Sequence, residues 1–300
     1  MDALATEQSR PDADDLETIS TEQLIARLVE HESAAVETLA TVVAPLARAA
    51  DAVAERMRRG GRLVYAGAGT PGRLATVDAA ECVPTFGLPL GVVVAVMAGG
   101  SIATSQAVEG AEDSAALAED DLAGVGLTAV DSLVGIAASG RTPYVLAALA
   151  RAKALGALTI GIANNIGSPV GIAADIGIEI DSGPEVLAGS TRLAAGTTQK
   201  IALNALSTAV MVRLGKTYRG RMVDVLATNQ KLRRRSVRIV QELTGIDEEG
   251  AMAAIAAAEG RVKIAVVMLR HGLPAADAEA ALEQAHGHVA AIDPARPEHS

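Results

Sequence analysis

Carboxylates are the side chains best suited to proton transfer near the glycine-rich segments of this chain. All five histidines lie outside residues 62–213, where strands and helices are predicted to alternate. Acid–base chemistry there falls to carboxylates, with tyrosine or lysine in reserve. Glu81 ends one predicted helix, and Glu112 lies in Glu109-Gly-Ala-Glu-Asp113. Spacing alone leaves two interpretations of Glu81 and Glu112 open. They are a general acid and a general base, or they are a carboxylate at a helix end and part of a hydrated acidic turn.

Two loops of small and hydroxyl residues follow predicted strands and are suited to holding an anion. One lies within Ala66-Gly-Ala-Gly-Thr-Pro-Gly-Arg73, the other within Ala138-Ser-Gly-Arg-Thr-Pro143. Glycine lets a backbone approach a ligand closely, and amides at a helix N-terminus attract anions. Because parallel strands end at one edge of a sheet, both loops would face one crevice. We expect a cradle for a phosphorylated small molecule, although the hydroxyls of Ser139 and Thr142 could instead cap a helix.

The elements that must position these residues alternate between strands and helices. Such alternation predicts an α/β fold with a mainly parallel sheet and helices on both faces. Ser20-Thr-Glu-Gln23 fits a capping box that starts a helical region ending near Gly60. Strands are predicted at 62–67, 91–98, 132–137, 157–162 and 175–180, and helices from Pro71, through 101–122, over 142–155 and over about 193–213.

Three parts follow from these patterns. Residues 1–60 form an N-terminal segment with helices, and residues 61–215 form the α/β domain. Residues 232–300 form a small helical C-terminal domain, with breaks near Gly245, Gly260 and Gly272-Leu-Pro274.

Composition narrows the class of protein. The net charge of −10 argues against a nucleic-acid partner, and the basic run Lys231–Arg235 is interpreted as a solvated helix face. No apolar run reaches the ~18 residues of a membrane-spanning helix. The N-terminus lacks the pattern of a signal peptide. A single cysteine, Cys82, fits a reducing compartment, so we expect a cytoplasmic protein.

Other chemistry is weakly indicated. Gly67-Ala-Gly-Thr-Pro-Gly72 matches a dinucleotide-binding fingerprint, but the strand Val92–Met97 ends without the acidic residue that this motif expects. His286 and His288 lack partner ligands for a metal, so no metal site is predicted. Cys82 has no histidine nearby in sequence and is interpreted as a buried side chain.

A series of motifs runs in order from about residue 6 to the helical tail. The motifs are Thr6-Glu-Gln8, Gly67-Ala-Gly-Thr-Pro-Gly-Arg-Leu74, Asp78-Ala-Ala-Glu-Cys82, Pro84-Thr-Phe-Gly87, Glu109-Gly-Ala-Glu-Asp113, Ala138-Ser-Gly-Arg-Thr-Pro-Tyr144, Gly183-Pro-Glu-Val186, Gly189-Ser-Thr-Arg-Leu193, Met222-Val-Asp224 and Thr228-Asn229. Taken together, they resemble the N-acetylmuramic acid 6-phosphate etherases. The resemblance implies the sugar isomerase (SIS) fold, a three-layer αβα sandwich that binds phosphosugars, and a homodimer with sites near the subunit interface.

The resemblance also implies an activity and a set of site residues. Members of this family cleave the D-lactyl ether of N-acetylmuramic acid 6-phosphate by C2 deprotonation, elimination and water addition, with no cofactor. By position in the motifs, Glu81 matches the general acid and Glu112 the C2 base. The residues that match phosphate or sugar contacts are Thr70, Ser139, Arg141, Thr142, Glu185, Ser190, Thr191 and Lys200.

Two positions depart from the family pattern. Pro71 stands where the family usually has serine, which removes a hydroxyl and an amide from the ligand loop. Ala194 replaces an expected lysine. These departures keep two alternatives open: a sugar-phosphate isomerase on the same fold, and a non-catalytic sensor like the glucokinase regulatory proteins. The retention of both Glu81 and Glu112 favours the lyase.

Overall fold

The structure, a computed structural model, describes residues 4–225, 227 and 229–293. The motif residue Thr228 lies outside this described part. The chain divides into two compact units, and each is described by itself. Unit 1 comprises Met1–Ala80 and Gly91–Ala209, and unit 2 comprises Glu81–Leu90 and Val210–Ser300.

Unit 1 is built on a five-stranded sheet in which all neighbouring strands are parallel, as the sequence predicted. Its order is β2-β1-β3-β4-β5, so the chain reverses direction across the sheet between β1 and β3. Open α/β sheets bind ligands beyond the C-terminal ends of strands at such a switch point. The strands are β1 (Leu63–Gly67), β2 (Val93–Met97), β3 (Ser132–Ala137), β4 (Leu158–Ala163) and β5 (Ile176–Glu179).

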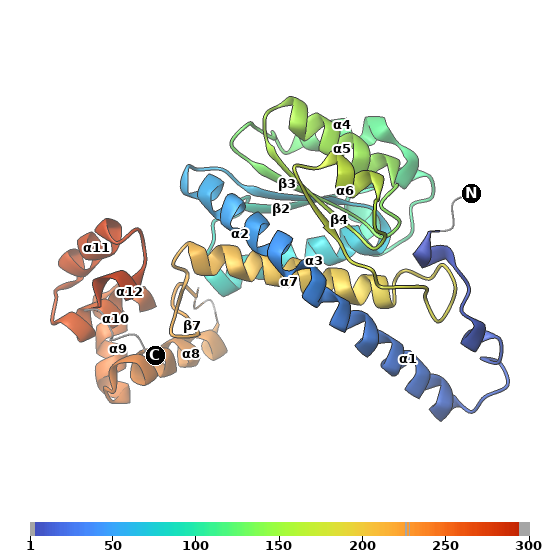
Figure 1. Cartoon of the computed structure of the whole chain (residues 1–300). Coiled ribbons are helices and arrows are strands. Elements are labelled where there is room, and N and C mark those ends of the chain that lie inside the picture. The colour runs from blue at the N-terminus through green and yellow to red at the C-terminus, as the bar shows by residue number, and fades with distance from the viewer. Residues whose placement is uncertain (1–3, 226, 228, 294–300) are drawn as a thin grey trace. The chain divides into compact units, whose positions relative to one another are not determined.

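Helices cover both faces of this sheet, which confirms the three-layer αβα architecture. Figure 1 shows α4, α5 and α6 above the sheet and α3 and α7 below it. The α-helices of unit 1 are α1 (Thr21–Glu37), α2 (Val43–Arg58), α3 (Gly69–Phe86), α4 (Ala115–Gly124), α5 (Pro143–Ala154), α6 (Pro169–Ala173) and α7 (Ala194–Arg213), the last running into unit 2 as α3 does.

Local sequence explains where these helices begin and end. The capping box at Ser20 is confirmed, because Ser20 Oγ accepts the Gln23 N–H and the Gln23 side chain accepts the Ser20 N–H. The predicted helices through 101–122 are only partly correct. This segment holds short 3-10 turns at Gly100–Thr104 and Ala111–Asp113 before α4. Glycines with positive φ interrupt any longer helix there: Gly99, Gly100 and Gly110.

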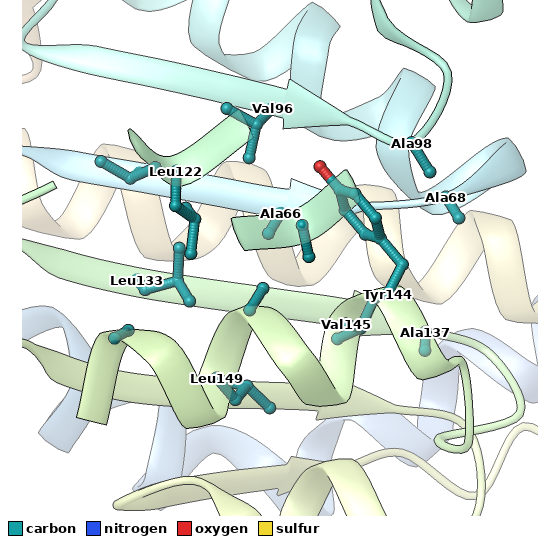
Figure 2. Close-up of a cluster of buried hydrophobic side chains, with 14 of the residues drawn as sticks. Ala66, Ala68, Val96, Ala98, Leu122, Leu133, Ala137, Tyr144, Val145 and Leu149 are labelled. Carbon is teal, nitrogen blue, oxygen red and sulfur yellow. The ribbon is translucent and has the colours of Figure 1, made fainter. Parts of the chain in front are cut away.

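One face of the sheet packs against α4 and α5 through a buried apolar cluster (Figure 2). Val64 and Ala66 of β1 alternate onto this face, as expected for a strand with period two. Tyr144 of α5 is fully buried in the cluster, and its hydroxyl donates to Asp121 Oδ2 at 2.6 Å. That bond offsets the cost of burying the phenol oxygen.

The other face is tied together by one buried carboxylate, that of Asp78 on α3. It accepts a 2.7 Å hydrogen bond from the Tyr65 hydroxyl of β1. It also accepts bonds from Asn204 and Ser207 of α7, at 2.6 and 3.0 Å. A strand and two helices therefore share one polar anchor beneath the sheet.

Unit 2 contains a small helical bundle. Gly245 and Gly272 end α8 and α10 in the left-handed conformation, as the predicted breaks require. A two-stranded ribbon of β6 (Thr217–Tyr218) and β7 (Arg221–Met222) was not predicted, because two-residue strands carry no readable periodicity. The helices are α8 (Gln230–Thr244), α9 (Glu248–Ala257), α10 (Val262–His271), α11 (Ala275–Gln284) and α12 (Val289–Ile292). No helix among the described residues is both long and apolar enough to cross a bilayer.

Candidate active site at the carboxyl edge of the sheet

A cavity of about 210 Å³ lies beyond the C-terminal ends of β1 and β2 in unit 1. Glu112 lines it from the 3-10 turn Ala111–Asp113. Gly69 and Arg73 line it from the first glycine loop and the start of α3, and Glu109 lines it from the segment after β2. The structure thus brings the predicted C2 base together with a predicted anion-binding loop.

Arg73 holds the segment that carries Glu112. Its Nε donates to the Thr104 carbonyl at 3.3 Å, and its Nη2 donates to the Gln106 carbonyl at 3.1 Å. A planar guanidinium suits such a two-point contact because its donors are fixed in a fork. Arg73 therefore stabilises the backbone that forms the cavity wall, a role that was not predicted from the sequence.

The first glycine loop lets α3 start directly against the sheet. A Cβ at Gly72 would lie 2.8 Å from the Gly67 carbonyl oxygen and 2.9 Å from Met97 Cγ, so only glycine fits there. Pro71 is the third residue of α3. It is accommodated because N–H groups in a first turn have no intrahelical acceptor. The fold tolerates this departure, as predicted, but the loop lacks one N–H that a ligand could use.

Thr70 and Thr191, two predicted substrate contacts, both lie against Gly196 near the start of α7. A Cβ at Gly196 would be 3.4 Å from Thr70 Cγ2 and 3.3 Å from the Thr191 carbonyl oxygen. Ser190 precedes Thr191 and is half-buried, whereas Lys200 is exposed further along α7. The first glycine loop and the Ser190–Thr191 loop therefore adjoin each other within unit 1.

The second predicted anion loop follows β3, the neighbour of β1. Ser139 Oγ accepts the Arg141 N–H at 3.2 Å, which organises the turn, and the Arg141 residue is exposed. Gly140 has φ +68°, and a Cβ there would lie 2.3 Å from Ser168 Cβ. Within the described residues, α5 begins after Thr142 without a side-chain cap bond. Helix capping is therefore not the use of the Thr142 hydroxyl.

Glu185 is fully buried and caps α7. Its two carboxylate oxygens each accept a 3.0 Å bond, from the N–H groups of Ala194 and Ala195. Burial raises the pKa of the Glu185 carboxyl, although these two amides act in the opposite direction. Glu185 thus fixes the end of the loop that carries Ser190 and Thr191. A direct contact between Glu185 and the sugar stays a prediction.

His31 approaches Glu185 from α1. Its Nε2 lies 3.9 Å from Glu185 Oε2, and its Nδ1 lies 3.0 Å from Nη1 of Arg10. Burial, with the nearby Arg10 cation, lowers the pKa of the His31 ring. The His31 ring therefore lies between the N-terminal segment and Glu185, and its Nδ1 is hydrogen-bonded to Arg10.

Glu81, the predicted general acid, lies on the last third of α3 and is exposed. It belongs to unit 2, whereas Glu112 belongs to unit 1. The pairing of these two carboxylates in one reaction therefore stays a prediction.

Sequence reasoning missed two asparagines that follow β4. Asn164 donates to Ser182 Oγ and Thr198 Oγ1, and it accepts from Gln199. Asn165 contacts Thr6 and the Ala138 carbonyl. The usable signal was a pair of amides directly after a buried strand, at the same edge as the glycine loops.

The parallel sheet and the loops at its carboxyl edge define a protein of the SIS class. A family model of the SIS domain matches residues 126–209, and one of the glucokinase regulatory protein N-terminal SIS domain matches residues 45–153. The fold is similar to that of a putative phosphosugar isomerase involved in capsule formation from Bacteroides fragilis, at a TM-score of 0.51. That alignment has 23% identity and covers 65% of this chain and 91% of the other.

Within the SIS class, the curated relatives define the family. The N-acetylmuramic acid 6-phosphate etherase of Streptomyces avermitilis is 51% identical over 298 residues, covering 99% of this chain and 96% of the relative. The etherase of Deinococcus radiodurans is 50% identical over 288 residues, covering 96% and 94%. The chain belongs to the N-acetylmuramic acid 6-phosphate etherase family.

Proposed function

We propose that this protein is a carbon–oxygen lyase that converts N-acetylmuramic acid 6-phosphate and water into N-acetylglucosamine 6-phosphate and D-lactate. The names and near-complete coverage of the relatives support the activity. The structural observation that carries it is the cavity in which Glu112 meets the first glycine loop. Catabolism of amino sugars released from the cell wall is the corresponding role.

The reaction uses the open-chain aldehyde of the sugar, whose C2 proton is acidic because it lies α to the carbonyl. Glu112 removes this proton, and the electron pair forms a C2–C3 double bond as the C3–O bond breaks. Glu81 gives a proton to the departing lactate oxygen. Water then adds at C3 of the unsaturated aldehyde, and C2 regains a proton. The sum consumes one water and needs no oxidant or reductant.

The phosphate is assigned to the loops at the β1/β3 switch point. Thr70 follows β1, and Ser139, Arg141 and Thr142 follow β3. The N-terminal end of α5 adds backbone dipoles that favour an anion there. Ser190, Thr191 and Lys200 are proposed sugar contacts. Thr191 adjoins Thr70 across Gly196, Ser190 directly precedes Thr191, and Lys200 is proposed from its position in the family motifs.

A homodimer and a cytoplasmic location complete the proposal. The exposed apolar side chains Ile25 and Val29 lie one helical turn apart on α1, a surface that a second copy could cover. A cytoplasmic location rests on the single cysteine and on the intracellular nature of phosphorylated sugars as substrates.

Lactate release from N-acetylmuramic acid 6-phosphate in D₂O tests the proposal. The wild type should release D-lactate and place deuterium at C2 of the product. Glu112→Gln should lose both lactate release and deuterium exchange at C2. Glu81→Gln should lose lactate release while C2 exchange continues. Glu119→Gln, an exposed change on α4, is the matched control and should behave as wild type.

The same assay separates the alternatives. An isomerase needs a C2 base but no acid at C3, so it would exchange C2 and be indifferent to Glu81→Gln. A sensor would bind a sugar phosphate, release no lactate and exchange no proton. Wild type that exchanges the C2 proton without releasing lactate would overturn the lyase assignment. Wild type that binds the sugar phosphate and catalyses neither reaction would overturn it as well.

A further inference from the structure

We propose that Thr6 and Asn165 form a clasp that positions the anion loop Ser139–Thr142, so that the N-terminal segment is part of the substrate-binding apparatus. Thr6 and Asn165 are 159 residues apart in the chain. The role in binding substrate rests on the proposed function, whereas the clasp itself rests on the contacts below.

The side-chain amide of Asn165 joins Thr6 to the Ala138 carbonyl. Its Nδ2 donates to Thr6 Oγ1 at 3.0 Å and to the Ala138 carbonyl at 3.0 Å. Both amide hydrogens are therefore used. Its Oδ1 faces the Thr6 N–H at 3.5 Å, a longer contact.

The Ala138 carbonyl is the point at which the clasp reaches the anion loop, because Ser139 follows it directly. This carbonyl accepts the Asn164 N–H at 3.0 Å as well as the Asn165 amide. The loop is held again at Gly140, whose carbonyl accepts the Val170 N–H at 2.9 Å. The Ala138 fixed point thus has two donors, and one of them, the Asn165 amide, also bonds Thr6.

Burial gives the clasp its strength. Thr6 is 0% exposed and Asn165 is 5% exposed. A buried amide N–H that loses its acceptor keeps its full desolvation penalty. Removing the Thr6 hydroxyl therefore leaves one Asn165 N–H unsatisfied, and the amide loses one of the two contacts that hold it in the orientation that bonds Ala138.

The N-terminal segment also touches the sugar side of the site. The position that a Cβ would take at Gly189 lies 3.2 Å from Glu7 Oε2. Gly189 directly precedes Ser190. Anchoring Thr6 thus places Glu7 beside the substrate loop, while Thr6 itself acts as a positioning residue and not as a catalytic one.

The first test is Thr6→Val, which keeps the branched shape and removes the hydroxyl. We expect the KM for N-acetylmuramic acid 6-phosphate to rise about tenfold with kcat within about twofold, since binding is lost equally in ground and transition states. The Kd for inorganic phosphate, measured by calorimetry, should rise by the same factor. Thr6→Ser restores the acceptor and should return both values to within about twofold of wild type.

Controls separate positioning from general damage. Thr18→Val changes an exposed threonine of the same N-terminal region and should leave KM and Kd unchanged. Asn165→Asp removes the donor to Ala138 and should reproduce the effect of Thr6→Val. If Thr6→Val fails to fold, Asn165→Asp and Thr6→Ser carry the comparison.

Two results would overturn the clasp: an unchanged phosphate Kd in folded Thr6→Val and Asn165→Asp, or a kcat loss with unchanged KM. Calorimetry with phosphate does not depend on etherase activity. If the wild type releases no lactate, the lyase proposal is wrong. If the wild type nevertheless binds phosphate more tightly than Thr6→Val does, the clasp is still supported.

Discussion

Arg73 and Glu112 line the same cavity, and the guanidinium of Arg73 is bonded to main-chain carbonyls of the segment that leads to Glu112. The cation therefore sets where the proposed base sits. The Arg73 guanidinium, at the end of the first predicted anion loop, is engaged in holding backbone.

Replacing Arg73 by lysine should lower kcat about 10- to 100-fold. A single ammonium cannot reproduce the fork to Thr104 and Gln106, so the base moves, and displacement near 1 Å can cost about 100-fold in rate. Steady-state lactate release measures the loss. Arg151→Lys on the exposed side of α5 is the control. A kcat equal to wild type in Arg73→Lys would show that the segment holds its shape unaided.

Restoring serine at position 71 should tighten substrate binding. Pro71→Ser returns one N–H and one hydroxyl to the loop that adjoins the cavity. Each net hydrogen bond contributes about 0.5–1.5 kcal/mol, so KM should fall roughly 2- to 10-fold. Pro89→Ser, an exposed change outside the site, provides the comparison. An unchanged KM would mean that the phosphate does not use this turn.

The buried Glu185 predicts an unusual slope of stability with pH. Its pKa in the folded state is raised above the ordinary 4.5, so the folded protein binds this proton more readily than the unfolded chain. The contribution of Glu185 to stability therefore falls as pH rises from 4.5 through the folded pKa. Urea unfolding of wild type and Glu185→Gln between pH 4 and 7 should show this slope in the wild type alone. Parallel slopes would contradict the prediction.

Asp131 predicts the opposite dependence. It accepts 2.8 Å bonds from the Arg62 backbone N–H and the Arg62 guanidinium, and a 2.9 Å bond from the Thr128 N–H. Burial alone would raise the pKa of Asp131, but these donors outweigh it, and the pKa lies below the ordinary 3.8. Its stabilisation is present above pH 3.8 and is lost as pH falls through the folded value.

Asp131→Ala should therefore destabilise the protein by about 1–3 kcal/mol near pH 7, the usual cost of leaving hydrogen-bond donors without their acceptor. The difference from wild type should shrink as the pH is lowered below 3.8. Chemical denaturation at pH 7 and pH 3 measures both. A deficit that is equal at the two pH values would assign the loss to packing instead of charge.

The sequence predicted the sheet well because buried parallel strands are short β-branched runs bounded by glycine. β3 lies at the predicted residues 132–137, and the four other strands lie within two residues of their predicted ends. The segment after β2 was misjudged, since apolar spacing gives no warning that Gly99 and Gly100 take positive φ. The five-residue α6 was missed because it is too short to show a period.

The parts of the candidate site that lie in short motifs directly after strands could be predicted from the sequence. Glu112 and the glycine loops are of this kind, because strand ends alone bring them to one edge. The burial of Glu185 was not predictable, because a Gly-Pro-Glu turn is typical of exposed loops. Its carboxylate is buried because it accepts the N–H groups at the start of α7. Contacts such as Thr6 with Asn165 depend on the whole sheet having formed and leave no local trace.

The span of the clasp has a consequence for protein synthesis. Thr6 leaves the ribosome 159 residues before its partner, a delay of roughly 8–32 s at about 5–20 residues per second. During that time the Thr6 hydroxyl lacks its native partner, and the loop after β3, which is translated shortly before Asn165, lacks this support. A nascent chain arrested before Asn165 emerges should therefore lack both the Asn165 contact and the Val170 bond to Gly140, and phosphate affinity should appear only after β4 and α6 have left the exit tunnel.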